Sequence, residues 1–257
     1  MNSLALALRQ VRFENRAFWR NPIAAFFVFA FPLLFLVIFN LLFGNRDLEL
    51  PGGTVSTSTF YVPAIVALSV IYACYNNVAV GMSFAREMGL LKRVHGTPLP
   101  GWSYMFGRIA HSVLVSVLLV AIVTAAGVLF YNVDVPTNTA PAFLVSLVVG
   151  AATFCALGMA VMTVIPNADA SPAIVNVSIL PLLFISDVFI PLQDAPGWLI
   201  AFADIFPVRH FAMAMHAAFD PFEKGAGFEP VHLLVMAAWM VGGVAVAVRF
   251  FSWEPRR

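Results

Sequence analysis

Charge is scarce in this sequence. Only 11% of its 257 residues are Asp, Glu, Lys or Arg, whereas 61% are hydrophobic. A soluble domain carries about 25% charged residues, so this composition excludes an ordinary water-soluble enzyme. A formal net charge of +1 provides no basic excess for nucleic acid, and we expect no nucleic-acid partner.

Two further absences argue against a metal site and a nucleotide-binding site in this chain. The chain has only two cysteines, Cys74 and Cys155, both inside apolar stretches and without a metal-ligand spacing. We therefore expect packed thiols and no metal site. The Gly-x-x-x-x-Gly-Lys-Ser/Thr loop that cradles nucleotide phosphates is also missing. We expect no cofactor bound by this chain, and any ATP would have to be bound by another one.

Long apolar runs are what the sequence has instead. Each lacks charge near its middle and is long enough for the about 20 helical residues that a hydrocarbon core requires. They predict an all-α membrane protein, a single domain over residues 1–257 with six transmembrane helices. The predicted spans are Ile23–Phe43, Phe60–Ser83, Ile109–Phe130, Pro141–Ile165, Pro172–Leu192 and Val231–Val248.

The basic residues predict which side each loop faces. Eleven of the 14 lysines and arginines fall in the N-terminal segment, in the segment between spans two and three, and at the end of the chain. Positive residues mark cytoplasmic loops. Both termini are therefore predicted to be cytoplasmic, in agreement with an even number of spans.

Residues 1–22 are predicted to form an amphipathic interfacial helix. Its apolar side chains lie close to one stripe, and its polar face consists of Arg9, Arg12, Arg16 and Arg20. Such a helix would lie in the inner headgroup layer with its arginines toward anionic membrane lipids. The alternative is a plain positive flank that only fixes orientation.

The second span carries polar side chains that are costly in lipid. Asn76 and Asn77 lie beside Tyr72 and Tyr75. An amide inside a span must face protein or water. Two interpretations stay open: a hydrogen bond between helices, or the polar lining of a substrate path or subunit seam.

Residues 193–228, between spans five and six, are predicted to form an outer re-entrant segment. Two moderately apolar pieces, Gly197–Phe206 and Val208–Phe219, are too short to cross a membrane and are separated by prolines. They predict short re-entrant or interfacial helices. His210 and His216 lie here with nearby aspartates, so acid–base chemistry on lipid is a second possibility, although packed histidines are favoured.

Residues 84–100 form the most informative inner segment. The pattern predicts a short cytoplasmic helix, broken at Gly96 and ended by a proline-rich turn. By itself it indicates either an orienting basic loop or a docking helix. However, it resembles the Arg-Glu-x-Gly-x-Leu-Lys-Arg-x-x-x-Thr-Pro-Leu motif of ABC-2-type permeases, the membrane subunits of bacterial ATP-binding-cassette exporters. The matching residues are Arg86, Glu87, Gly89, Leu91, Lys92, Arg93, Thr97, Pro98 and Leu99.

A second stretch, from Pro181 to Phe211, carries the same resemblance, and the closest subfamily looks like the daunorubicin-resistance permeases. One residue departs from the family pattern: Asp187 stands where a glycine or another small residue is usual. An acid near the outer end of a span must be solvated or paired. It could lie at headgroup level, face a substrate exit or pair with Arg209.

The resemblance implies a function. Two copies of a cytoplasmic ATPase, with ATP and Mg²⁺, would energise a homodimer or a pair of related permeases in the bacterial plasma membrane. Residues 84–100 would transmit ATP-driven closure mechanically, so no catalytic residue is expected here. Drug or lipid export is favoured over export of lipid-linked glycans or polymers. An ion-coupled secondary transporter is the alternative from another class, but the charge-free span interiors argue against it.

Overall fold

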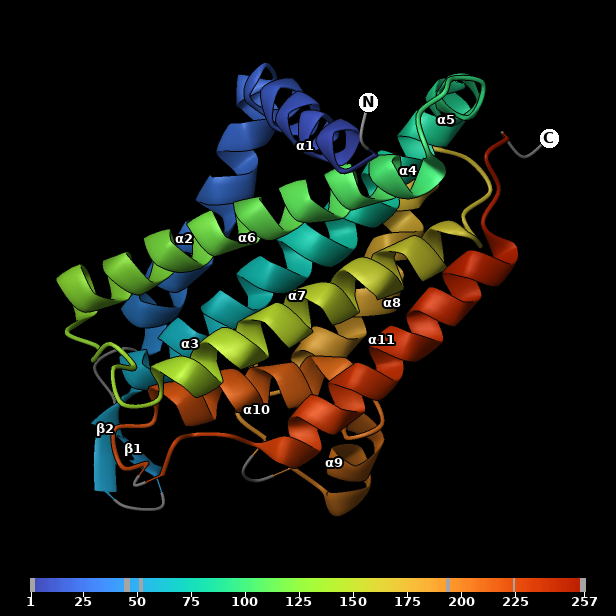
Figure 1. Cartoon of the computed structure of the whole chain (residues 1–257). Helices are drawn as coiled ribbons and strands as arrows, with labels where there is room; N and C mark the ends of the chain where they lie inside the picture. The colour runs from blue at the N-terminus through green and yellow to red at the C-terminus, as the bar shows by residue number, and fades with distance from the viewer. Residues whose placement is uncertain (1–2, 44–46, 51–52, 193–194, 224, 255–257) are drawn as a thin grey trace.

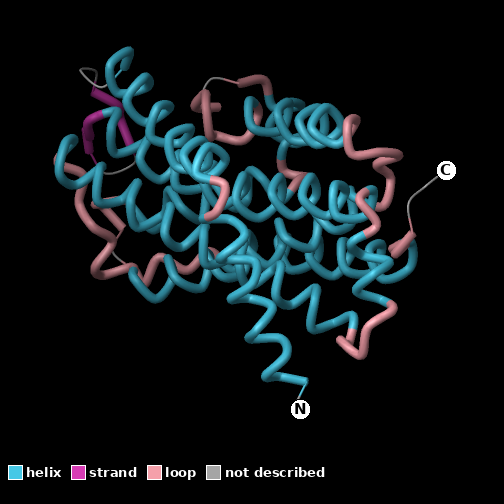
Figure 2. The backbone as a smooth tube through the Cα atoms, turned by 90° about the horizontal axis from the view of Figure 1, so that it is seen from above, coloured by secondary structure: helices cyan, strands magenta, loops and turns pink. Residues whose placement is uncertain are grey.

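The computed structural model describes residues 3–43, 47–50, 53–192, 195–223 and 225–254, and helices make up most of it (Figure 1). Viewed from above, the helices pack side by side with two short strands at one edge (Figure 2). The elements are α1 (Ser3–Trp19), α2 (Pro22–Phe43), β1 (Asp47–Leu50), β2 (Gly53–Ser56), α3 (Thr57–Ile71), the π-helical turn η1 (Tyr72–Asn76), α4 (Asn77–Glu87), α5 (Leu90–His95), α6 (Gly101–Tyr131), α7 (Ala140–Met162), α8 (Ser171–Phe184), α9 (Gly197–Ala203), α10 (Pro207–Phe219) and α11 (Pro230–Phe250).

Most of the predicted spans have a matching helix. In the described part of the chain, α2, the α3–η1–α4 unit, α6, α7 and α11 are long and apolar enough to cross a membrane. The count rises to six if α9 and α10, which meet at 96°, are taken together as one bent span. The two short helices predicted between spans five and six are therefore present, and their re-entrant or interfacial position stays a prediction.

The fifth predicted span is shorter than expected. α8 ends at Phe184, whereas the apolar run continues to Leu192. Fourteen helical residues cover about 21 Å, less than a hydrocarbon core of about 30 Å. The helix stops because the backbone turns after Ile185 and Asp187 adopts a positive φ of 56°. An apolar run does not reveal such a turn.

The segment between the first two predicted spans contains a short β-hairpin, which the all-α prediction did not include. β1 pairs antiparallel with β2, with Leu48 opposite Val55. Alternating apolar and polar residues on either side of Pro51-Gly52-Gly53 were the available signal.

The second predicted span forms the centre of the molecule. In the α3–η1–α4 unit, 89% of the most apolar window is buried, against 17% in α2 and in α11. α3 packs against α2, α6, α7 and α10. Polar side chains on this unit therefore face protein or a cavity between helices.

The molecule has two distinct ends (Figure 1). The α5 end, as we call it, carries α1, α5 and the segment that follows α11. The hairpin end carries β1, β2 and α9. α1 lies across the α5 end and packs mainly on α6.

Candidate functional site

The predicted coupling segment divides into two parts. α4 continues the second span as far as Glu87, the chain turns at Met88 and Gly89, and α5 is a separate helix. Gly89 has a φ of 68°, a conformation that a side chain would disfavour. The predicted single helix with one break at Gly96 was therefore wrong, because the span extends into the motif and a first break lies at Gly89.

Arg86 is a buried residue at the end of the central helix. Only 2% of it is exposed, and its guanidinium donates hydrogen bonds to the carbonyl oxygens of Met162, the last residue of α7, and Ile165, just after that helix. The carboxylate of Glu87 accepts a hydrogen bond from the backbone N–H of Ala168 in the following turn. These two motif residues tie α4 to the α7–α8 turn.

The rest of the motif is more exposed, with the exception of Leu91. Leu91 is fully buried and anchors α5, whereas Lys92 and Arg93 face outward. Thr97 donates to the carbonyl of Val94 at 2.7 Å, and its hydroxyl accepts from the N–H of Leu99, which fixes the turn through Pro98. The α5 end thus presents a short basic helix and a rigid turn.

α1 is held to the bundle by a buried ion pair that the sequence did not reveal. Glu14, 6% exposed, accepts from Arg108 of α6 at 2.9 Å and from Gln10 at 3.0 Å. Arg108 also donates to the backbone carbonyl of Asn77 at 3.3 Å. The arginines of the predicted polar face, Arg9, Arg12, Arg16 and Arg20, are all exposed.

Three of the predicted substrate-path residues line one cavity. Tyr72, Asn76 and Asn77 face a space of about 640 Å³ between α2, η1 with α4, and α6. Its other walls are mostly apolar and include Phe27 and Phe31 of α2. Asn77 donates to Ser112 at 3.2 Å. Asn76, in the π-helical turn, also lines the cavity, and such turns are frequent at functional sites.

Tyr75 points elsewhere. Its hydroxyl lies 2.6 Å from Ser178 of α8, and its ring borders a smaller apolar cavity of about 330 Å³ beside Trp239. The structure therefore places Tyr75 between the central helix and α8, away from the other three candidates.

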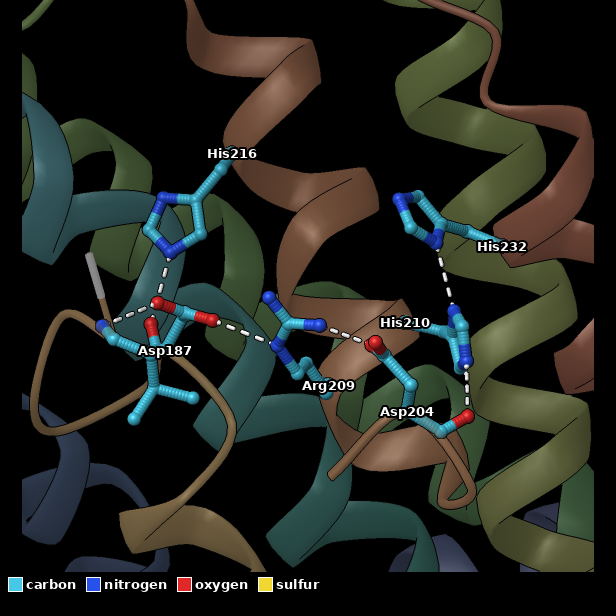
Figure 3. Close-up of polar contacts among 7 residues, drawn as sticks. Asp187, Asp204, Arg209, His210, His216 and His232 are labelled. Atoms are coloured by element: carbon cyan, nitrogen blue, oxygen red, sulfur yellow. Dashed lines mark hydrogen bonds and ion pairs between the residues drawn. The ribbon is translucent and has the colours of Figure 1, made fainter. Parts of the chain in front are cut away.

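Asp187 lies in a polar network with Arg209 and Asp204 (Figure 3), and since Asp204 directly follows α9, the network lies at the hairpin end. Its carboxylate accepts from Arg209 Nε at 3.0 Å and from the N–H of Leu192 at 2.8 Å. Arg209 also pairs with Asp204. Of the three interpretations of Asp187, pairing with Arg209 is present. The same carboxylate borders a cavity of about 490 Å³ that is also lined by His216 and Glu229.

The histidines of this region take part in structural hydrogen bonds (Figure 3). His210 Nδ1 lies 2.7 Å from His232 Nδ1, and His210 Nε2 lies 2.9 Å from the carbonyl of Asp204. Because a carbonyl only accepts, His210 Nε2 carries a proton, and the two Nδ1 atoms share another. His216 Nε2 likewise donates to the carbonyl of Asp187. The described residues contain no group of three or more His, Cys, Asp or Glu placed to hold a metal.

Comparison with known proteins gives a consistent result. The family model described as ABC-2 type transporter matches residues 7–219. The chain is 26% identical over 193 residues to a Porphyra purpurea protein named as transport permease ycf38, covering 75% of this chain and 66% of the relative. It is 23% identical over 152 residues to the Escherichia coli K12 protein named as multidrug ABC transporter permease YbhR, covering 59% and 41%. It is 27% identical over 237 residues to the Streptomyces coeruleorubidus daunorubicin resistance ABC transporter permease protein DrrB1, covering 90% and 78%.

Proposed function

Because this chain belongs to the ABC-2 type transporter family, we propose that it is the transmembrane permease of an ATP-driven exporter. It moves an amphiphilic drug or lipid out of the cytoplasm or inner leaflet, with energy from a separate ATPase. Two permease subunits, either identical or related, pair with two ATPase subunits in a bacterial plasma membrane. The observation that carries this proposal is the family match over 7–219.

The α5 end is the proposed cytoplasmic docking site. α5 exposes Lys92 and Arg93, and the Thr97–Leu99 turn is fixed by two hydrogen bonds. A partner that pushes on this surface would move α4 through the short turn at Gly89. Arg86 and Glu87 would pass that movement to the α7–α8 turn, because both bind backbone atoms there.

The cavity between α2 and the central helix is the proposed start of the substrate path. Its volume of about 640 Å³ lies within the 300–1,000 Å³ or so that is typical of small-molecule sites. Aromatic walls with a few amides suit an amphiphilic molecule. The names of DrrB1 and YbhR refer to daunorubicin resistance and multidrug transport, which supports a drug as the substrate class. The cavity at Asp187 lies at the opposite end and would serve as the exit.

Two other functions remain as alternatives. One is export of a lipid-linked glycan or other polymer, and the other is ion-coupled secondary transport. The first would be favoured by a polar lining, whereas the walls of the central cavity are mostly apolar. The second needs titratable groups deep in the bilayer. The histidine pair and Asp187 instead belong to the network around Asp204 (Figure 3), which directly follows α9 at the hairpin end.

The test is affinity purification of the chain from cells that carry its native operon, in mild detergent. We expect a stoichiometric ATPase whose turnover is stimulated by an exported amphiphile after reconstitution. The reconstituted complex is then offered fluorescent cationic drugs, labelled phospholipids and lipid-linked oligosaccharides. Movement of oligosaccharide alone would favour glycan export. Transport without a co-purifying ATPase would overturn the proposal.

A further inference from the structure

The segment after α11 turns back onto the coupling segment. α11 ends at Phe250, and the next described residues, Phe251–Glu254, lie at the α5 end of the molecule (Figure 1). The indole of Trp253 is 5.2 Å from the imidazole of His95, the last residue of α5, and 5.0 Å from the ring of Phe251. α5 therefore contacts the residues that follow α11, the last predicted span.

Trp253 also lies against the first residue of α6. A Cβ added to Gly101 would come within 2.8 Å of the indole. The ring thus fills the corner between the end of α5 and the start of α6. It is partly buried and packs against the main hydrophobic core, as do Val94 and Leu99 on either side of the motif turn.

This contact matters because α5 is short and buries few of its side chains. The helix has six residues, and only Leu91 is buried. Lys92 and Glu254 are 3.4 Å apart, but their side chains are 67% and 69% exposed. An exposed ion pair of this kind contributes about 0–1 kcal/mol. The apolar contact of Trp253 is therefore the main restraint from the post-α11 segment.

The last span is in turn well connected to the bundle. α11 packs most extensively against α7. Thr153 of α7 donates to the carbonyl of Met236 at 3.1 Å, and Gly243 allows the backbone of Ala156 to approach closely. A displacement of α5 that carried Trp253 with it would therefore reach α7 through α11.

We propose that Trp253 is a positioning residue that couples α5 to the last transmembrane helix. It provides a second mechanical connection from the docking surface into the bundle, independent of the one through Arg86 and Glu87. This proposal rests on the proposed function, since α5 must be the element on which the ATPase acts.

The first experiment measures the position of α5 without any transport. Nitroxide labels are placed at Leu90→Cys in α5 and Val248→Cys in α11, both of which are exposed positions. The native cysteines are buried and should not take the label. We expect a narrow distance distribution in the parent and in Trp253→Phe, and a clearly broader one in Trp253→Ala. An unchanged distribution in Trp253→Ala would overturn the positioning role.

The second experiment measures the amount of substrate moved per ATP hydrolysed in the reconstituted permease–ATPase complex. Trp253→Ala should lower this ratio at least threefold, and Trp253→Phe should largely restore it. Trp102→Ala is the control, because Trp102, in the first turn of α6, is 51% exposed. An unchanged ratio in Trp253→Ala, or an equal loss in Trp102→Ala, would overturn the proposal. If the parent complex moves nothing with ATP, the proposed function fails, whereas the distance measurement still tests the contact.

Discussion

Two adjacent asparagines both line the central cavity, and Asn77 is in addition hydrogen-bonded to another helix. Asn77 hydrogen-bonds Ser112 across to α6, and its backbone carbonyl accepts from Arg108. Asn76, at the end of the π-helical turn, lines the central cavity. Asn77 matches the interpretation as a hydrogen bond between helices, and Asn76 matches the interpretation as a cavity lining.

Replacing each asparagine separates these two roles. Asn77→Leu should destabilise the detergent-solubilised protein by about 0.6–1.7 kcal/mol, the range for one hydrogen bond between membrane helices. Asn76→Leu should leave the melting temperature nearly unchanged and alter drug stimulation of the ATPase by several fold. Thermal unfolding and drug titration of both variants check this. Equal effects of the two variants on both measurements would contradict the assignment.

The two arginines of the coupling motif also have different proposed roles, one structural and one in docking. Arg86 is buried against backbone carbonyls, whereas Arg93 is exposed on α5. Hydrogen bonds to a charged group contribute about 1.5–3 kcal/mol each, so Arg86→Met should lower the melting temperature by several degrees. Arg93→Met should melt like the parent but bind the ATPase more weakly. Thermal unfolding and co-purification measure both effects, and an Arg86→Met protein as stable as the parent would refute the structural role.

At the level of elements, α1 is attached to the bundle by few polar contacts. Glu14 and Arg108 are 94 residues apart in sequence and form a buried pair. Gly81 makes room for the arginine, since an added Cβ would overlap its guanidinium. The exposed faces of α1 carry its arginines together with Leu4 and Leu8. This arrangement suits a helix that rests on both protein and lipid.

Breaking the pair should release α1. Removing one partner of a buried ion pair costs about 3–5 kcal/mol, so Glu14→Ala and Arg108→Ala should each expose α1 to faster cleavage by trypsin. The double variant should be cut no faster than either single one, because the two residues act through the same contact. Asn15→Ala, an exposed neighbour, is the control. Additive effects of the two substitutions would show that the residues act separately.

The sequence predicted the long helices well but predicted their ends and contacts poorly. Apolar runs report burial in lipid or protein, so five of the six predicted spans have a long helix. They do not report where a helix stops, and α8 ends eight residues early because the chain turns around Asp187. The motif at 84–100 was found by pattern alone. The burial of Arg86 was not, because its carbonyl partners lie 76 and 79 residues away.

For the whole molecule, the elements divide between two ends. α1, α5 and the post-α11 segment gather at one end, and the hairpin and α9 gather at the other (Figure 1). The proposed docking surface and the cavity at Asp187 therefore lie at opposite ends. An exporter requires this separation, provided that the chain crosses the membrane as the basic residues predict. The crossing to test is the one at α8, because this helix has only 14 residues.

Labelling of one added cysteine decides whether the chain crosses the membrane at α8. Cys74 and Cys155 are buried, so an added cysteine can be labelled without removing them. Asp169→Cys lies in the exposed α7–α8 turn and Ala226→Cys in the exposed loop before α11. If α8 and the residues after it complete the fifth crossing, a membrane-impermeant maleimide should label Ala226→Cys in intact cells and Asp169→Cys only after permeabilisation. Labelling of both positions from the same side would mean that the chain does not cross between them. The six-span topology and the cytoplasmic placement of both termini would then be wrong together, because an odd number of crossings puts the two ends of the chain on opposite sides.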